Sequence, residues 1–314
     1  MSKVSSARTI LVTGGLGMIG AHTARSLADL GHDVVITAHH RTEVPSFLAG
    51  RVTVEALDVT DRDAFLALAG RHDISDIVHL AGSIPGEDPV AFFRTDLAGL
   101  LNALDAARTW GVRRFAAASS LGVYIGRTEI PWHEDLALPT VDLPHLIIAF
   151  KKAVEPLTTH SLRGSGVQPV VLRIGSIWGP LVDPESPFNH IPPFISAALR
   201  GEQPRPLHAD DGFDCCYAPD AGRAIALLMT APALRHDVYN ISSGRPATNR
   251  EFADALQAIT PGLRLGLRPG RQHGPGGDPY LDITRLTDDT GFAPAFDVAK
   301  AVADYVTWRA GNPR

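Results

Sequence analysis

Thr13-Gly14-Gly15-Leu16-Gly17-Met18-Ile19-Gly20 is the stretch that decides the fold of this chain. It follows an apolar run at 9–12 that is typical of a buried strand, and it opens the segment 18–30, whose apolar residues have helical spacing. The spacing G-x-x-G-x-x-G is typical of a dinucleotide loop, because its glycines allow a tight turn and close approach of the backbone to a pyrophosphate. Free N–H groups at the helix start would bind the phosphates. The residues predicted to contribute are Gly14, Gly17, Met18, Ile19 and Gly20.

Short β-branched runs alternate with helical stretches through the first half of the chain. Strands are predicted at 9–12, 33–37, 52–56, 76–80, 114–118 and 169–174, and helices at 18–30, 61–69 (capped by Thr60), 89–110 and 147–162. Such alternation with continuous apolar strands is typical of a parallel sheet that is covered on both faces. We therefore expect an α/β fold built on a doubly wound parallel sheet of the Rossmann type.

The amino-acid composition of the chain changes near residue 179. The stretch 180–206 is rich in proline and 261–279 is rich in Gly, Arg and Pro, so both are expected to form loops. We interpret residues 1–178 as the Rossmann domain and 179–314 as mostly a smaller, discontinuous substrate-binding cap. Segments expected to return to the sheet or to cover it lie at about 213–244, with a helix at 220–229 and a strand at 237–241, and at 298–309.

The composition disfavours several kinds of partner. The chain has 314 residues, a formal net charge of -5 and 45% hydrophobic residues, which is typical of a globular protein with a large core. It has no long Lys or Arg run, so we expect a small-molecule substrate and neither nucleic acid nor a membrane as partner. No apolar run approaches the roughly 20 residues of a membrane helix, and the short polar stretch 1–8 has no leader pattern. We expect a cytoplasmic protein.

The cysteines and histidines do not predict a metal site. Cys215 and Cys216 are adjacent, which rarely suits a disulfide, and two thiols alone do not make a zinc site. The pair His39-His40 lacks the H-E-x-x-H spacing of a zinc enzyme. We therefore expect two reduced thiols and no metal.

The end of the second predicted strand bears on the choice of cofactor. Proteins that bind NAD usually carry an acidic residue there, which holds the ribose 2′-hydroxyl. This chain has Ala38, followed by His39, His40 and Arg41. The missing acid removes repulsion against a 2′-phosphate, and a guanidinium suits a phosphate. We expect NADP(H) in preference to NAD(H), which remains possible, with His39 and Arg41 among the residues that bind it.

Several motifs, in order along the chain, resemble those of one family. The matching stretches are Thr13–Gly20, Asp58-Val59, His79-Leu80-Ala81-Gly82, Ser119–Tyr124, Arg173–Pro180, Tyr239–Ile241 and Gly291–Pro294. With them the chain resembles an extended short-chain dehydrogenase/reductase of the NAD-dependent epimerase/dehydratase type. The resemblance implies that the cofactor contacts Asp58, Val59, Leu80, Ala81, Gly82, Ile174 and Ser176.

The resemblance also implies a catalytic Ser, Tyr and Lys, the last two spaced as Y-x-x-x-K. Ser120 and Lys151 stand at the serine and lysine positions, and Lys151 would also hold the cofactor, but the tyrosine position is Ile147. Taking Lys152 as the lysine places Ile148 there instead. The chain is thus similar to an atypical member that lacks the active-site tyrosine. General acid–base catalysis, typically worth about a hundred- to ten-thousand-fold, needs another group.

Three interpretations of this departure stay open. An enzyme that transfers hydride between a nicotinamide and a carbonyl or alcohol could use a relocated acid, for which His145 and Tyr124 are candidates. A second kind of enzyme would need no phenol, because water or Ser120 protonates the substrate or because the substrate is a polarised double bond. The third interpretation is a non-catalytic NADP(H)-binding protein that senses redox state or binds a partner.

A nucleotide-sugar epimerase or dehydratase is a further alternative. The resemblance implies an arginine that opens an R-D-[FY] motif and binds the substrate diphosphate, but this chain has Phe213 at that position. Arg205, Arg268 or Arg271 could replace it, so we favour a less charged substrate without excluding a nucleotide sugar. The pocket for it could include Trp178, Asn189 and His190. A homodimer formed through the helices at 89–110 and 147–162 is also implied.

Overall fold

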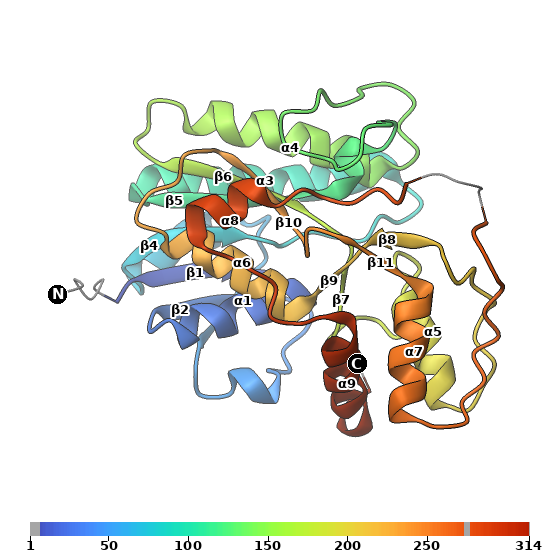
Figure 1. Cartoon of the computed structure of the whole chain (residues 1–314). Coiled ribbons are helices and arrows are strands. Elements are labelled where there is room, and N and C mark those ends of the chain that lie inside the picture. Colours follow the sequence, from blue (N-terminus) through green and yellow to red (C-terminus); the bar gives the residue numbers. More distant parts are fainter. Residues whose placement is uncertain (1–6, 273–276, 314) are drawn as a thin grey trace.

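A seven-stranded parallel sheet forms the centre of the molecule (Figure 1). The structure is a computed structural model and describes residues 7–272 and 277–313. Every pairing between the named strands of this sheet is parallel, and the strand order is β10-β6-β5-β4-β1-β2-β3. Its strands are β1 (Thr9–Thr13), β2 (Asp33–Ala38), β3 (Thr53–Ala56), β4 (Ile74–His79), β5 (Arg114–Ser120), β6 (Gln168–Ile174) and β10 (Val238–Ile241). The predicted doubly wound fold is confirmed.

Helices cover both faces of the sheet, as Figure 1 shows. One face carries α3 (Pro89–Trp110) and α4 (Leu146–Leu162), with the short helix α2 (Arg62–Leu66) and the 3-10 turn η2 (Ala67–Gly70) beside them. The other face carries α1 (Met18–Asp29), α6 (Ala218–Thr230) and α8 (Thr284–Thr290). Two separate apolar cores result, one on each face, because the strands are buried on both sides.

Local capping sets the ends of the helix α3. Its first residue is Pro89, whose fixed φ suits the first turn, and the Asp88 carboxylate accepts hydrogen bonds from the N–H groups of Val90 and Ala91. The helix stops at Gly111, which has a φ of 64°. The predicted bounds at 89–110 are therefore correct.

The cap is a smaller body with its own apolar core, to the lower right of the sheet in Figure 1. Three helices enclose that core: α5 (Ile191–Leu199), α7 (Asn249–Ile259) and α9 (Val298–Gly311). Two small sheets connect them, an antiparallel pair of β8 (Gly212–Asp214) with β11 (Pro246–Thr248) and a parallel pair of β7 (Ile177–Trp178) with β9 (Cys216–Tyr217). Two 3-10 turns, η1 (Ser46–Leu48) and η3 (Leu121–Tyr124), lie outside the cap.

Several expectations for this half of the chain are wrong. The proline-rich stretch contains α5, because Pro192 and Pro193 occupy its first turn, where proline is tolerated. The helix at 298–309 packs against α7 in the cap and does not cover the sheet. The segment 213–217 pairs outside the large sheet, so the chain returns to the sheet only with α6.

The predicted cap of α2 is also wrong by one residue. The Asp61 carboxylate accepts the Ala64 N–H at 3.0 Å and is the N-cap. Thr60 instead donates both its N–H and its hydroxyl to the Asp58 carboxylate. In the described part of the chain, no helix is both long enough and apolar enough to cross a membrane.

Candidate active site

The glycine loop forms a bare backbone cradle between β1 and α1. Gly14 has a φ of +67°, and its carbonyl accepts the Gly17 N–H at 3.0 Å. A Cβ atom at Gly14 would lie 2.9 Å from the backbone nitrogen of Ala81, and one at Gly20 would lie 2.3 Å from the Gly14 oxygen. Because Gly17 is the N-cap of α1 and has no side chain, the first N–H groups of that helix stay accessible to an anion.

A groove with a volume of about 1080 Å³ extends from this cradle along the carboxyl ends of the strands. That is the edge at which open α/β sheets bind ligands. Ten residues predicted to bind the cofactor line the groove, namely Gly14, Gly17, Met18, His39, Arg41, Asp58, Val59, Leu80, Ala81 and Gly82. The glycine cradle and the size of the groove fit a dinucleotide.

The outer end of the groove is polar and rich in histidine. The rings of His39 and His40 are tilted by 32° with their centroids 3.8 Å apart, and the His39 Nε2 lies 3.7 Å from the Asp58 carboxylate. Hydrogen bonds from Thr60 are the main reason why the pKa of Asp58 is lowered. Arg41 crosses above the loop and donates to the Leu16 carbonyl at 3.2 Å. The end of β2 thus presents imidazole and guanidinium groups where a carboxylate could have stood.

Lys151 lies beneath the inner end of the groove. A small cavity lined by Lys151 shares Ala81 and Asp96 with the groove. The Lys151 ammonium donates to the Ala118 carbonyl at 2.8 Å, and burial lowers its pKa, an effect that Asp96 opposes. His79 lies in the same cavity, where burial, helped by Lys151, lowers its pKa to about 3. His79 is therefore neutral, with Nδ1 2.9 Å from the Thr13 hydroxyl.

Two adjacent serines at the end of β5 have different surroundings. Ser119 is buried and donates to Glu155, which also forms a buried ion pair with Arg173 at 2.8 Å. The Ser120 Oγ accepts the Gly122 N–H at 3.1 Å and the residue is only half-buried. Accepting that bond leaves the Ser120 hydroxyl hydrogen for donation to a ligand.

The end of β6 is fixed by the cap. The Ser176 N–H donates to the buried Asp214 carboxylate, while its hydroxyl accepts from the Asn189 amide, each at 3.0 Å. Ile174 is buried in the sheet core. Neither residue lines the groove, and the same holds for Ile19, which packs on the core, and for Gly20. These assignments stay predictions.

Comparison with known proteins decides the family. The model of the NAD dependent epimerase/dehydratase family matches residues 10–242. The chain belongs to that family. A dTDP-glucose 4,6-dehydratase of Streptomyces griseus is 30% identical over 95% of this chain and 93% of its own length. A putative UDP-glucose 4-epimerase of Methanocaldococcus jannaschii is 24% identical over 97% of this chain and 99% of its own.

Solved structures of epimerases have the same fold as this family member. The UDP-glucose 4-epimerase of Thermotoga maritima with UDP-glucose superposes with a TM-score of 0.81 at 23% identity, covering 98% of this chain and 100% of the other. The Thermus thermophilus UDP-glucose 4-epimerase in complex with NAD has a TM-score of 0.74 at 26% identity, with coverage of 97% and 100%. The groove lies where Rossmann sheets bind dinucleotides.

The structure separates the two lysines that left the family's tyrosine position ambiguous. Lys151 lines the small cavity that shares Ala81 and Asp96 with the groove, and it donates to the Ala118 carbonyl. The Lys152 ammonium instead donates to the carbonyls of Val123 and Pro139. These contacts favour Lys151 over Lys152 as the counterpart of the family lysine, and the assignment stays a prediction. The position four residues before it is Ile147, whose half-buried side chain packs against the core beneath α3 and α4.

The two relocated acids proposed from the sequence lie in different surroundings. His145 is exposed at the start of α4, and its Nδ1 accepts the Ile147 N–H at 3.1 Å, so a neutral ring carries its proton on Nε2. Tyr124 is fully buried, with its hydroxyl bonded to Asn240 at 2.9 Å and to Arg173 at 2.7 Å. Burial raises the pKa of Tyr124 to about 12. Because the buried Tyr124 hydroxyl is held by Asn240 and Arg173, its contacts favour a packing role over the acid role.

Some residues of the groove belong to none of the sequence motifs described above. Asp96 on α3 accepts hydrogen bonds from the Ser83 N–H and hydroxyl, and both residues line the groove. Leu181, Val182 and Asp183 close it from the cap side. A helix-face analysis of α3 could have found Asp96, since it points toward the same side as Gly99. The segment 181–183 has no such regular pattern.

Proposed function

We propose that this chain is a nicotinamide-dependent enzyme that interconverts an alcohol and a carbonyl on a small molecule held beside Ser120. The observation that carries the proposal is Lys151, which lies beneath the inner end of a groove that begins at the glycine cradle. The cradle and the start of α1 would hold the pyrophosphate, and Lys151 would hold the inner ribose. The nicotinamide supplies the hydride donor or acceptor when bound.

Ser120 is the group that we assign to the substrate oxygen. Its Oγ accepts the Gly122 N–H, which polarises the hydroxyl and strengthens it as a donor. A donor of this kind stabilises negative charge that develops on the oxygen during reduction. Ile147 offers no proton, so proton supply falls to water or to His145, whose exposed ring stands two residues earlier.

The test of this function uses turnover and cofactor binding together. Purified protein is mixed with the reduced cofactor and a panel of ketones and aldehydes, and the nicotinamide absorbance is followed. We expect Ser120→Ala to lower kcat by about tenfold to a hundredfold with unchanged cofactor affinity, and Lys151→Met to weaken cofactor binding. Cofactor binding with no turnover, unaltered by either substitution, would instead support the non-catalytic alternative.

For the cofactor we propose NADP(H) in preference to NAD(H). Structures of related epimerases contain NAD. The preference is supported by Ala38 at the end of β2 and by the exposed Arg41 and His39 beside it. Calorimetric titration should give a lower Kd for NADP+ than for NAD+, and Arg41→Ala should remove that difference. Equal affinities in the wild-type protein would contradict the preference.

A nucleotide-sugar epimerase or dehydratase is the second candidate. It is supported by the names of the relatives, which include dTDP-glucose 4,6-dehydratase and UDP-glucose 4-epimerase. Against it stands Phe213, which occupies the predicted position of the diphosphate-binding arginine and packs on His190 with ring centroids 4.5 Å apart. Binding of UDP or dTDP at micromolar concentration would favour this candidate.

We also propose that the chain forms a homodimer through α3 and α4. The two helices lie side by side on one face of the sheet (Figure 1), and α3 exposes Val90 and Leu101 to 59% and 45%. Light scattering after size exclusion should give twice the mass of the chain, and Leu101→Glu should shift it toward the monomer.

A cytoplasmic location is the last part of the proposal. Cys215 and Cys216 are both free and buried, and burial raises the pKa of both thiols. Such thiols are typical of a reducing compartment.

A further inference from the structure

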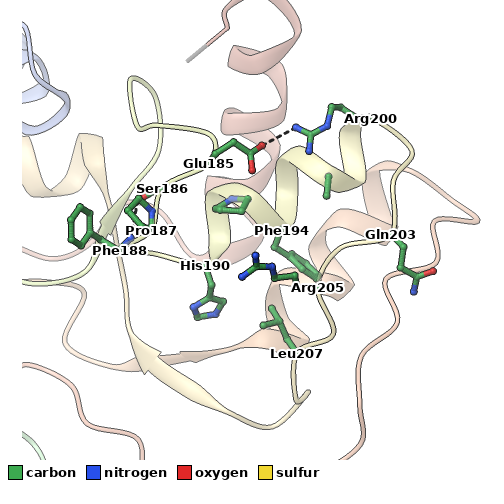
Figure 2. Close-up of a pocket in the computed structure, with 12 residues that line it drawn as sticks. Glu185, Ser186, Pro187, Phe188, His190, Phe194, Arg200, Gln203, Arg205 and Leu207 are labelled. Carbon is green, nitrogen blue, oxygen red and sulfur yellow. Dashed lines mark hydrogen bonds and ion pairs between the residues drawn. The ribbon is translucent and has the colours of Figure 1, made fainter.

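The cap contains a second cavity, separate from the cofactor groove, with a volume of about 610 Å³. It lies between α5 and the segments 185–190 and 203–207 (Figure 2). The two cavities are lined by neighbouring parts of one stretch of chain, because 181–183 line the groove and 185–188 line the cap cavity. A molecule whose reacting carbon lies in the groove could therefore extend into the cap cavity.

A contact with α4 also links this cavity to the reacting end. Phe188 lines the cavity and is 62% exposed. Its ring meets His145 edge to face at 6.5 Å, and His145 in turn caps the turn of α4 that contains Ile147. The cavity residue Phe188 is thus linked through His145 to Ile147, the position where the family carries its tyrosine.

One wall of the cavity is apolar and partly aromatic. Phe188, Phe194, Pro193 and Leu207 contribute to it. His190 is fixed against this wall, because its Nε2 lies 2.8 Å from the Asn249 side-chain oxygen. The Asn249 amide nitrogen donates to the His208 carbonyl at 2.9 Å, so its oxygen is left to accept from His190. Such a surface suits a flat apolar ring.

The charges around the cavity leave one cation uncompensated. Arg200 is paired with Glu185 at 3.0 Å and with Glu202 at 2.8 Å. Arg205 is exposed, and within 7–272 and 277–313 no acidic side chain pairs with it. Figure 2 shows its guanidinium directed toward the middle of the cavity, beside Phe194 and Leu207. An arginine presents two parallel donors that match a carboxylate or a phosphate.

We propose that the cap cavity binds a flat apolar ring carrying one acidic group, a carboxylate or a phosphate monoester, and that Arg205 holds that group. The inference rests on the proposed function, since the rest of the same molecule would place its alcohol or carbonyl at Ser120. A nucleoside diphosphate fits less well, because Phe213 occupies the predicted position of the diphosphate-binding arginine and packs on His190.

The test compares four probes by calorimetry on the full chain: 2-naphthoate, 2-naphthyl phosphate, 2-naphthol and UDP. We expect the two acidic naphthyl probes to bind at least tenfold more tightly than 2-naphthol and than UDP, and the better of the two identifies the acidic group. Arg205→Ala should weaken the acidic probes at least tenfold and leave 2-naphthol unchanged. Arg205→Lys should recover part of the loss, since it restores the charge without the paired donors.

Arg264→Ala is the matched control, because Arg264 is an exposed arginine of the cap outside the cavity lining. It should leave the affinity of every probe unchanged. Cofactor affinity is measured in the same samples. If the wild-type protein binds no cofactor, the proposed function is refuted, and not this inference alone. With cofactor binding intact, the inference is overturned if 2-naphthol binds as tightly as 2-naphthoate, if UDP binds most tightly, or if Arg205→Ala has no effect.

Discussion

The glycine loop leaves no room for a Cβ atom at Gly20. A methyl group on Gly20 would lie 2.3 Å from the Gly14 oxygen and 2.9 Å from its carbonyl carbon, so the helix would have to move away from the loop. We expect Gly20→Ala to cost about 1–3 kcal/mol of unfolding free energy and to weaken cofactor binding at least tenfold. Urea unfolding and cofactor titration measure the two effects.

The matched control is Gly70→Ala, because a Cβ atom at Gly70 meets no heavy atom within 4 Å and its φ is not positive. It should leave cofactor affinity unchanged. Equal affinities in the Gly20 and Gly70 variants would show that close packing of α1 on the loop is not needed for binding.

For single residues, the sequence predicts the local backbone of the glycine loop better than it predicts which groups a side chain contacts. The glycine spacing placed the cradle because backbone conformation there depends on local sterics. Between Lys151 and Lys152 spacing alone did not decide, since one side chain reaches Ala118 and the other reaches the carbonyls of Val123 and Pro139. The sequence predicts Thr60 as a helix cap, but its hydroxyl donates to the Asp58 carboxylate. Such choices depend on tertiary neighbours.

Among the elements, the start of α7 is held by a reciprocal cap. The Thr248 hydroxyl accepts the Glu251 N–H, and the Glu251 carboxylate accepts the Thr248 N–H at 2.7 Å. We expect Thr248→Ala to lower the unfolding free energy by about 0.5–2 kcal/mol, measured by thermal and urea unfolding. Asn249 begins this helix and fixes His190, so the variant should also weaken 2-naphthoate binding in the cap cavity.

Thr248→Ser keeps a hydroxyl at the same position and is the control for this prediction. Its stability and its affinity for 2-naphthoate should both stay close to those of the wild-type chain. Cofactor affinity should be unchanged in both variants, since the groove lining includes no residue of α7. A loss of cofactor binding in Thr248→Ala would contradict this separation of the cap helix from the groove.

Elements of the sheet were predictable, whereas those of the cap were only partly so. Continuous apolar strands and helices with clear stops, such as Gly111, carry their own signal. In α5 the proline content predicts a loop, but both prolines occupy the first turn, where they leave the hydrogen-bond pattern intact. The missed helix forms one side of the cap cavity.

For the whole molecule, buried neutral histidine makes folding depend on pH. His22 is a buried residue of α1, and its ring stacks on Phe47 with ring centroids 5.0 Å apart. Burial, together with the nearby Arg25, lowers the pKa of His22 to about 4. Above pH 6.5 the ring is neutral in both the folded and the unfolded chain. Between pH 6.5 and about 4 only the unfolded chain binds the proton, so this contribution to stability is lost as the pH falls.

We therefore expect His22→Leu to reduce the acid sensitivity of folding. Relative to the variant, the wild-type chain should lose about 1.4 kcal/mol of unfolding free energy per pH unit between pH 6.5 and about 4. Urea unfolding at half-unit pH steps measures the difference in slope, which cancels the contributions of buried carboxyl groups common to both proteins. His160→Leu removes an exposed histidine of α4 and should leave the slope unchanged. Parallel curves for wild type and His22→Leu would show that the folded chain admits a proton at His22 as readily as the unfolded chain does.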